Sequence, residues 1–246
     1  MTDFRLLAKL VLSTLLFANL ALCLVHVSVK HGNDYCVVLN ASQISGQIQY
    51  NTPDNKLQTY PFDVNETTVQ ASGSCHSTTV VKDEIKLQFL PNGAPALLKL
   101  WSLHIVFQKN PASTNLQTFA SVDYSLDVSF SPLLNSSVVS HVYSNDVMAY
   151  EMQSTIPGVS YSCSSTTLKL GHDSWLKFSG LKVIANTKMQ NETMEGLSVE
   201  KCSADAVVEG GGSSVLLIVG IVLAVLVVLG VLVGLAVYIK KTRMSH

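Results

Sequence analysis

The chain has 246 residues, and charged residues make up only 13% of it, against about 25% in an ordinary soluble protein. Lys and Arg together number 16 and Asp and Glu 17, so the formal net charge is −1. This balance provides no basic surface for nucleic acid, and the 48% share of apolar residues excludes a disordered chain. The apolar excess is concentrated at the two ends of the chain.

The N-terminal end has the organisation of a secretory signal peptide. A charged start is followed by an apolar run from Leu10 to Leu24. Ala21 and Cys23 provide small residues at the positions that signal peptidase requires, which predicts that residues 1–23 are removed. The alternative is a signal anchor that is not cleaved.

The C-terminal end predicts one membrane-spanning helix. Residues 215–239 contain no charged side chain, and a helix of that length, about 37 Å, crosses a hydrocarbon core of about 30 Å. Lys240, Lys241 and Arg243 follow directly, and the positive-inside rule places them in the cytosol. We therefore predict a type I membrane protein with a Gly-rich stalk at 210–214 and a cytosolic tail at 240–246.

Gly230 and Gly234 form a Gly-x-x-x-Gly motif within this span. Small residues at that spacing let two membrane helices approach closely. The motif is thus a candidate for helix pairing, in a homo-oligomer or with another membrane protein as lateral partner. Because glycine is common in membrane helices generally, a span without a partner other than the lipid bilayer is the alternative.

Residues 24–209 remain for the lumenal or extracellular side, where we predict a glycosylated domain. All Asn-x-Ser/Thr sequons of the chain fall in this segment; their asparagines are Asn40, Asn65, Asn135 and Asn191. A sequon is a weak signal alone, but a secreted segment makes it an acceptor site for an N-linked glycan.

The same segment alternates between apolar and polar residues, which is the pattern of half-buried β-strands. The longest alternating runs are 101–107 and 122–130, and shorter ones are 85–89, 168–170 and 181–185. No stretch before the membrane span has a sustained helical period. We therefore predict an all-β, antiparallel domain in one unit, with a loop at 110–115.

Four cysteines remain after the signal peptide: Cys36, Cys75, Cys163 and Cys202. An even number in an oxidising compartment predicts two disulfides. The separations within Cys36–Cys75 and within Cys163–Cys202 are both 39 residues, which favours these sequential pairs. Close pairs such as C-x₂-C, which zinc sites use, do not occur, so we predict no metal site.

An immunoglobulin domain is the rival β fold with paired cysteines. Trp175 lies 12 residues after Cys163, as the tryptophan of that fold does. However, a 39-residue separation is short for the immunoglobulin disulfide, and Glu200 stands where its conserved tyrosine would be. The segment from Cys36 to Cys75 contains no tryptophan, so the immunoglobulin interpretation is disfavoured.

Around its cysteines the sequence resembles the lysosome-associated membrane glycoprotein (LAMP) family. The similar segments are Lys30-His31-Gly32-Asn33-Asp34-Tyr35-Cys36-Val37-Val38-Leu39, Ser72-Gly73-Ser74-Cys75, Ser160-Tyr161-Ser162-Cys163, Leu181-Lys182-Val183-Ile184-Ala185 and Lys201-Cys202-Ser203-Ala204-Asp205. The resemblance implies a LAMP-type β-prism with two sequential disulfides and N-linked glycans, in a short member with one lumenal domain. It also implies a role in protecting the lysosomal or late endosomal membrane, in lysosome integrity and in fusion.

The cytosolic tail departs from the family. The family's tail typically ends in Gly-Tyr-x-x-apolar, which sorting adaptors bind, whereas Tyr238 here is followed three places on by Lys241. The alternative function is therefore that of a LAMP-like sorting adaptor or cell-surface protein, which pairs with another membrane protein in a transport vesicle or at the plasma membrane.

No sequence motif for catalysis or phosphate binding is present: G-x-S-x-G, H-E-x-x-H, the P-loop and G-x-G-x-x-G are all missing. We predict no enzymatic activity, no cofactor and no small-molecule substrate. Six histidines are scattered through the lumenal segment: His26, His31, His76, His104, His141 and His172. Their protonation in an acidic lumen suggests pH-dependent self-association or partner binding, with solvated surface histidines as the alternative.

Overall fold

The computed structural model describes residues 25–76, 82–145 and 150–206. The chain divides into two units: the first ends at Lys201 and the second starts at Cys202. The second unit includes the short helix α2 (Ser203–Ala206). Within the described residues no helix has the length and apolar character to cross a bilayer. The predicted signal peptide, stalk, span and tail, with Gly230 and Gly234, lie outside these residues.

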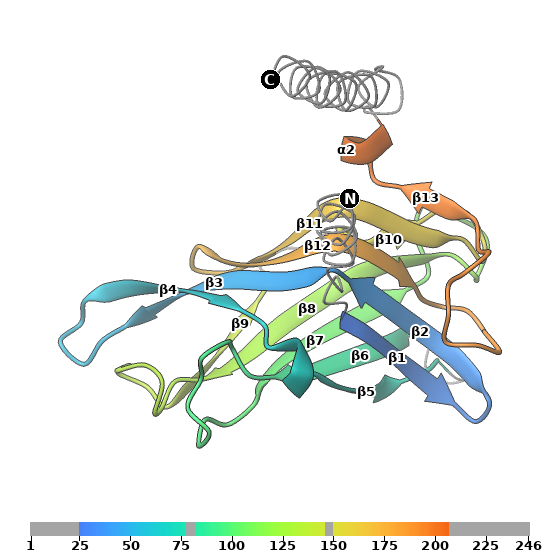
Figure 1. Ribbon diagram of the computed structural model, residues 1–246. Coiled ribbons are helices and arrows are strands. Elements are labelled where there is room, and N and C mark those ends of the chain that lie inside the picture. The colour runs from blue at the N-terminus through green and yellow to red at the C-terminus, as the bar shows by residue number, and fades with distance from the viewer. Residues whose placement is uncertain (1–24, 77–81, 146–149, 207–246) are drawn as a thin grey trace, which may run out of the picture. The chain divides into compact units, whose positions relative to one another are not determined.

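The β domain consists of two sheets (Figure 1). The first contains β1 (Val25–His31), β2 (Asp34–Ala41), β3 (Gln43–Asn51), β4 (Leu57–Asp63), β11 (Ser160–Leu170), β12 (Ser174–Ile184) and β13 (Val199–Lys201). The second contains β5 (Gln70–Ser74), β6 (Lys82–Phe89), β7 (Trp101–Gln108), β8 (Phe119–Ser129), β9 (Ser140–Ser144) and β10 (Gln153–Ser154). A single 3₁₀ turn, η1 (Glu66–Thr68), precedes β5 in the described residues.

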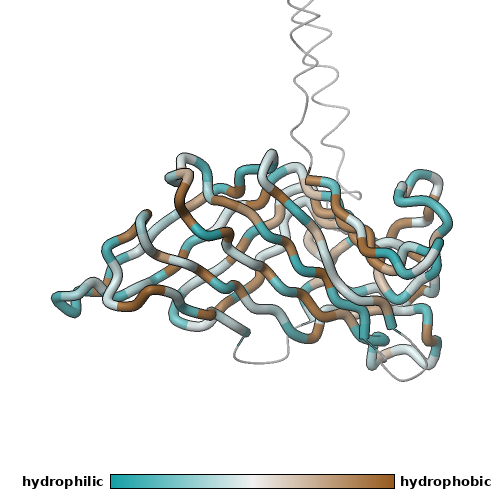
Figure 2. Tube along the Cα trace, turned by 90° about the horizontal axis from the view of Figure 1, so that it is seen from below, coloured by the Kyte–Doolittle hydropathy of each residue, from teal (hydrophilic) through white to brown (hydrophobic). Residues whose placement is uncertain are grey.

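The predicted all-β class is confirmed, and the alternating runs of the sequence are strands. Those at 85–89, 101–107 and 122–130 fall in or across β6, β7 and β8, which pair as neighbours in the second sheet. Along β6, and along β8 from Val122 onward, buried and more exposed residues alternate, and Figure 2 shows the corresponding alternation of hydropathy along the strands. One face of each strand therefore packs into the interior and the other faces water.

The expectation of a purely antiparallel domain is wrong at one place. β13 pairs in parallel with β11, from Ser160 opposite Val199 to Ser162 opposite Lys201. The end of β12 lies beside the start of β11, with Val183 opposite Tyr161. The chain leaving β12 therefore needs only to pass over that end of β11 to place β13 on its other side, running in the same direction.

The core between the sheets contains a cluster of aromatic side chains. Trp101 is fully buried, and the ring of Phe62, from the first sheet, lies 4.9 Å from it in an edge-to-face arrangement. Phe89 on β6 packs against both rings. This cluster, and not Trp175, is the buried tryptophan site, which is a further difference from an immunoglobulin core.

A kink in the first sheet separates β2 from β3. β12 pairs with β3 along Trp175–Ser179 and with β2 along Lys182–Ile184, so two consecutive strands share one neighbour. Between them, the backbone N–H and the hydroxyl of Ser42 both donate to the carbonyl of Ser179, each at 2.8 Å. Gly180 follows with a φ of +56°, a conformation that favours glycine.

A disulfide joins the two sheets. Cys36, on β2 of the first sheet, is bonded to Cys75, directly after β5 of the second. Cys163 and Cys202 are also disulfide-bonded. All four cysteines are thus in disulfides, as the sequence predicts, and Cys36–Cys75 is one of the predicted pairs.

Candidate functional site

The four sequons lie at different levels of exposure. Asn135 and Asn191 are exposed, in the connections after β8 and β12. Asn40 is half-buried on β2, and its side-chain oxygen contacts the imidazole of His26 on the neighbouring strand β1. Whether these asparagines carry glycans remains a prediction from the sequence.

Asn65 is held in a specific local conformation. Its side-chain oxygen caps η1 by accepting the N–H of Thr67 at 3.2 Å, and it also accepts the Thr67 hydroxyl at 2.7 Å. Thr67 is the hydroxyl residue of the same sequon. Because the side-chain oxygen makes both contacts, the amide nitrogen, to which a glycan would be attached, is directed away from the turn.

A groove of about 290 Å³ opens where the end of β3, the start of β4 and β9 come together. Its aromatic wall is formed by Tyr50, Phe130 and Tyr143, and its apolar rim by Leu57 and Val138. Further residues from β3, from β9 and the connection before it, and from the β11–β12 turn complete the lining: Gln49, Asn51, Ser136, Ser137, His141 and His172. Among the described residues this lining contains no Asp, Glu, Lys or Arg, so the groove is suited to a neutral ligand surface with both apolar and hydrogen-bonding parts.

The aromatic wall is fixed by contacts between the two sheets. The Tyr143 hydroxyl donates to the carbonyl oxygen of Gln49 at 2.7 Å, and burial raises the pKa of Tyr143 to about 12. The rings of Tyr50 and Phe130 lie 5.6 Å apart. With its raised pKa, the Tyr143 hydroxyl stays a neutral hydrogen-bond donor at all physiological pH values.

Two histidines line the same groove. The ring of His141 lies 4.6 Å from that of Tyr143 and 6.1 Å from that of His172. His172 and Asp173 both have positive φ, 61° and 54°, in the tight turn between β11 and β12. Both side chains are exposed, which agrees with the interpretation of these histidines as surface residues.

A buried carboxylate connects the sheets away from the groove. Asp83, on β6, is fully buried and accepts the backbone N–H of His76 at 2.6 Å and that of Asn186 at 2.7 Å, one on each oxygen. The His76 imidazole lies 3.3 Å from the same oxygen as its own N–H. Burial raises the pKa of Asp83, while the contacts from His76 and Asn186 act in the opposite direction.

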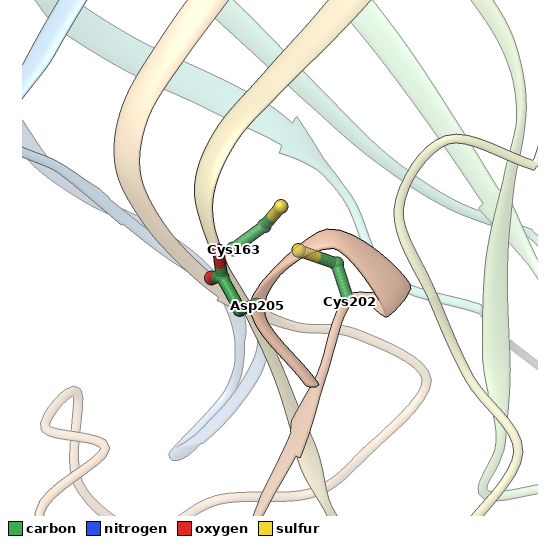
Figure 3. A group of neighbouring side chains, drawn as sticks. All are labelled: Cys163, Cys202 and Asp205. Carbon is green, nitrogen blue, oxygen red and sulfur yellow. The ribbon is translucent and has the colours of Figure 1, made fainter. Parts of the chain in front are cut away.

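Figure 3 shows three side chains of metal-ligand type: Cys163 on β11, and Cys202 and Asp205 in the second unit. Both cysteines are disulfide-bonded. A metal ligand must be a thiolate, which a disulfide sulfur is not. These residues are therefore not a candidate metal site.

Comparison with known proteins identifies the fold. No protein-family model and no curated protein matches the sequence. Among solved structures, the membrane-proximal domain of mouse LAMP-1 matches with a TM-score of 0.55 and 21% identity, covering 74% of this chain and 98% of that one. The β domain has the LAMP domain fold.

Two further structures support this LAMP assignment of the fold. The membrane-distal domain of mouse LAMP-2 matches with a TM-score of 0.53 and 18% identity, over 72% of this chain and 98% of that one. Human LAMP-3 matches with a TM-score of 0.50 and 16% identity, over 73% and 99%. Both membrane-proximal and membrane-distal LAMP domains are thus similar, over nearly their whole lengths, to the single β domain of this chain.

Two features of the LAMP-like domain were missed by sequence reasoning. Asp83 has a signal in the sequence, because it lies in phase with Ile85, Leu87 and Phe89 and therefore on the buried face of β6. The groove has no such signal, because its residues come from segments that are far apart in the chain and only pair in the folded domain.

Proposed function

We propose that the chain is a LAMP-like type I membrane glycoprotein of the endosomal and lysosomal limiting membrane. Its work is physical: a rigid, glycan-bearing β domain covers the membrane and shields it from lumenal hydrolases. The observation that carries this proposal is the LAMP fold of the β domain, which accounts for 98–99% of the length of the matched LAMP chains. The predicted signal peptide and C-terminal span would deliver that domain to the lumenal face.

The surface of the β domain is compatible with such a coat. Asn40 lies on β2 of the first sheet, and Asn65, Asn135 and Asn191 lie in the connections that follow β4, β8 and β12, so the predicted glycans would be attached at four separate places on the domain. The disulfide between β2 and the end of β5 links the sheets covalently. Both features limit access of proteases to an opened chain.

Localisation in the protein's own cells tests the proposal. An epitope tag placed after Cys23 leaves the cytosolic tail native. Enrichment in acidic, hydrolase-containing organelles, a loss of mass on treatment with a glycosidase, and leakier organelles after depletion of the protein are the expected results. Normal membrane integrity in depleted cells would contradict the protective function.

The second candidate is a LAMP-like sorting or cell-surface protein that acts by lateral contact with another membrane protein. Lys241, which stands three places after Tyr238 where the family's tail signal has an apolar residue, favours it. Residence in transport vesicles or at the plasma membrane, with redistribution of a second membrane protein on depletion, is the result that would support this candidate over the first. Replacing Gly230 and Gly234 by Leu tests whether the predicted span provides the contact.

A further inference from the structure

The groove beside β9 exposes apolar surface next to a glycosylation sequon. Leu57 is 60% exposed, Val138 49% and Val139 76%, and the first two line the groove itself. Clustered exposed apolar side chains in a hollow usually mark a surface that something covers. The sequon Asn135-Ser136-Ser137 contributes two of its own residues, Ser136 and Ser137, to the groove lining.

The backbone fixes the position of Asn135 at the rim. On one side, Leu134 donates its N–H to the carbonyl of Phe130 at 2.7 Å; on the other, Ser137 donates its N–H to the carbonyl of Asn51 at 2.8 Å. The Ser136 hydroxyl also donates to Asn51. The backbone that carries Asn135 is therefore held beside the groove lining, which lowers the loss of freedom when a sugar attached there docks.

The chemistry of the lining matches that of a neutral sugar. One face of a pyranose ring is rich in C–H groups and packs against aromatic rings such as Tyr50, while its hydroxyl and acetamide groups need hydrogen-bonding partners. Gln49, Asn51 and the imidazoles of His141 and His172 provide such partners around the aromatic wall. The volume of about 290 Å³ is close to the lower limit, about 300 Å³, of pockets that hold small molecules, which is suitable for one sugar ring.

We propose that the innermost sugar of an N-glycan on Asn135 folds back into this groove and covers its aromatic wall. The inference rests on the proposed function, because it requires a lumenal, glycosylated domain. It gives the Asn135 glycan a structural role within the domain, distinct from that of a glycan that extends into solvent. Asn191 is also exposed, but its sequon does not line the groove, so it provides a matched control.

Hydrogen exchange of the full chain in detergent, purified from cells that add N-glycans, tests the proposal. Asn135→Gln is expected to speed exchange about fivefold or more in β9 and at the β3–β4 tip. Asn191→Gln is expected to change neither. An endoglycosidase that leaves one N-acetylglucosamine on each asparagine should keep the protection, because the innermost sugar makes the contact.

Equal exchange at the groove in the wild type and in Asn135→Gln would overturn the inference. So would mass spectra showing Asn135 unmodified while other sequons are occupied, a result that leaves the proposed function standing. If no sequon of the chain is occupied, the proposed function fails together with the inference. A nuclear Overhauser contact between the sugar and the Tyr50 ring would provide direct support.

Discussion

Replacing Asp83 by Asn tests whether the buried carboxylate holds the two sheets together. The two oxygens of Asp83 accept one N–H each, from His76 and from Asn186. Asn has the same shape but only one acceptor oxygen, so its amide group must face one of these N–H groups, donor against donor. A substitution that is conservative in volume is therefore not conservative in hydrogen bonding.

The expected cost follows from the contacts that are lost. One buried N–H without an acceptor costs about 1–3 kcal/mol. For a domain of this size each kcal/mol lowers the melting temperature by about 2–4 °C, so Asp83→Asn is expected to lower it by about 2–12 °C. Asp83→Ala removes both acceptors and leaves a cavity, and it should cost more than Asp83→Asn.

The change should also alter the pH dependence of stability. Because burial raises the pKa of Asp83, the folded domain binds this proton more tightly than the unfolded chain does. The contribution of Asp83 is therefore complete below its unfolded value of 3.8 and declines as the pH rises through the folded-state pKa. The advantage of the wild type over Asp83→Asn should shrink with rising pH.

Thermal unfolding followed by tryptophan fluorescence measures both effects, since Trp101 is fully buried. Asp127→Asn is the matched control, because Asp127 is exposed on the nearby strand β8. An equal melting temperature for Asp83→Asn and wild type would refute the assignment of Asp83 as a link between the sheets. A wild-type advantage that grows with pH would refute the direction of its pKa shift.

Three further changes test other parts of the fold by the same unfolding assay. Gly180→Ala should cost about 1–2 kcal/mol for its positive φ, and more for the crowding of the new Cβ at 2.8 Å from the Ser42 hydroxyl. Gly158→Ala, with a φ of +66° and open space, should show the backbone cost alone, and equal costs for the two variants would contradict the close contact between Gly180 and Ser42. Replacing Cys36 and Cys75 together by Ser should lower the free energy of unfolding by about 3–4 kcal/mol, because the disulfide closes a loop that spans 39 residues. An unchanged unfolding midpoint would show that the disulfide does not constrain the unfolded chain. Because the pKa of Tyr143 is about 12 in the fold and about 10 in the unfolded chain, the domain should lose stability as the pH rises above about 10. Tyr143→Phe should reduce that loss, and an identical alkaline stability profile for the variant and the wild type would argue against the buried hydroxyl.

The strands were predictable because each one carries its own pattern. The alternation in β6, β7 and β8 places the apolar residues on one face, and this is sufficient to give both the strand and the buried side. The equal spacing of the cysteines similarly favoured the Cys36–Cys75 pair. These signals are local or arithmetic, so a single sequence contains them.

The parallel pairing of β13 and the groove could not be predicted in the same way. β13 has three residues, too few for a period, and its place beside β11 depends on where the preceding connection crosses. In the sequence alone, nothing distinguishes the groove residues Tyr50, Phe130 and Tyr143 from ordinary strand or core residues. Only the pairing of the sheets shows that they share a wall.

The links between the sheets lie where a protective domain needs them. β5 is exposed along its whole length and forms an edge of the second sheet, so it is the kind of strand that opens locally. Its C-terminal end is held by the disulfide of Cys75 and, one residue later, by the N–H of His76 on the buried Asp83. Asn65, the sequon in front of β5, is set by its cap on η1. Proteases cut the open form of a substrate. In the proposed hydrolase-rich lumen, the disulfide, the buried acceptor and the predicted glycan near this exposed edge would each reduce cleavage. Under the proposed protective function, the buried acceptor Asp83 would have the role of keeping the β domain closed.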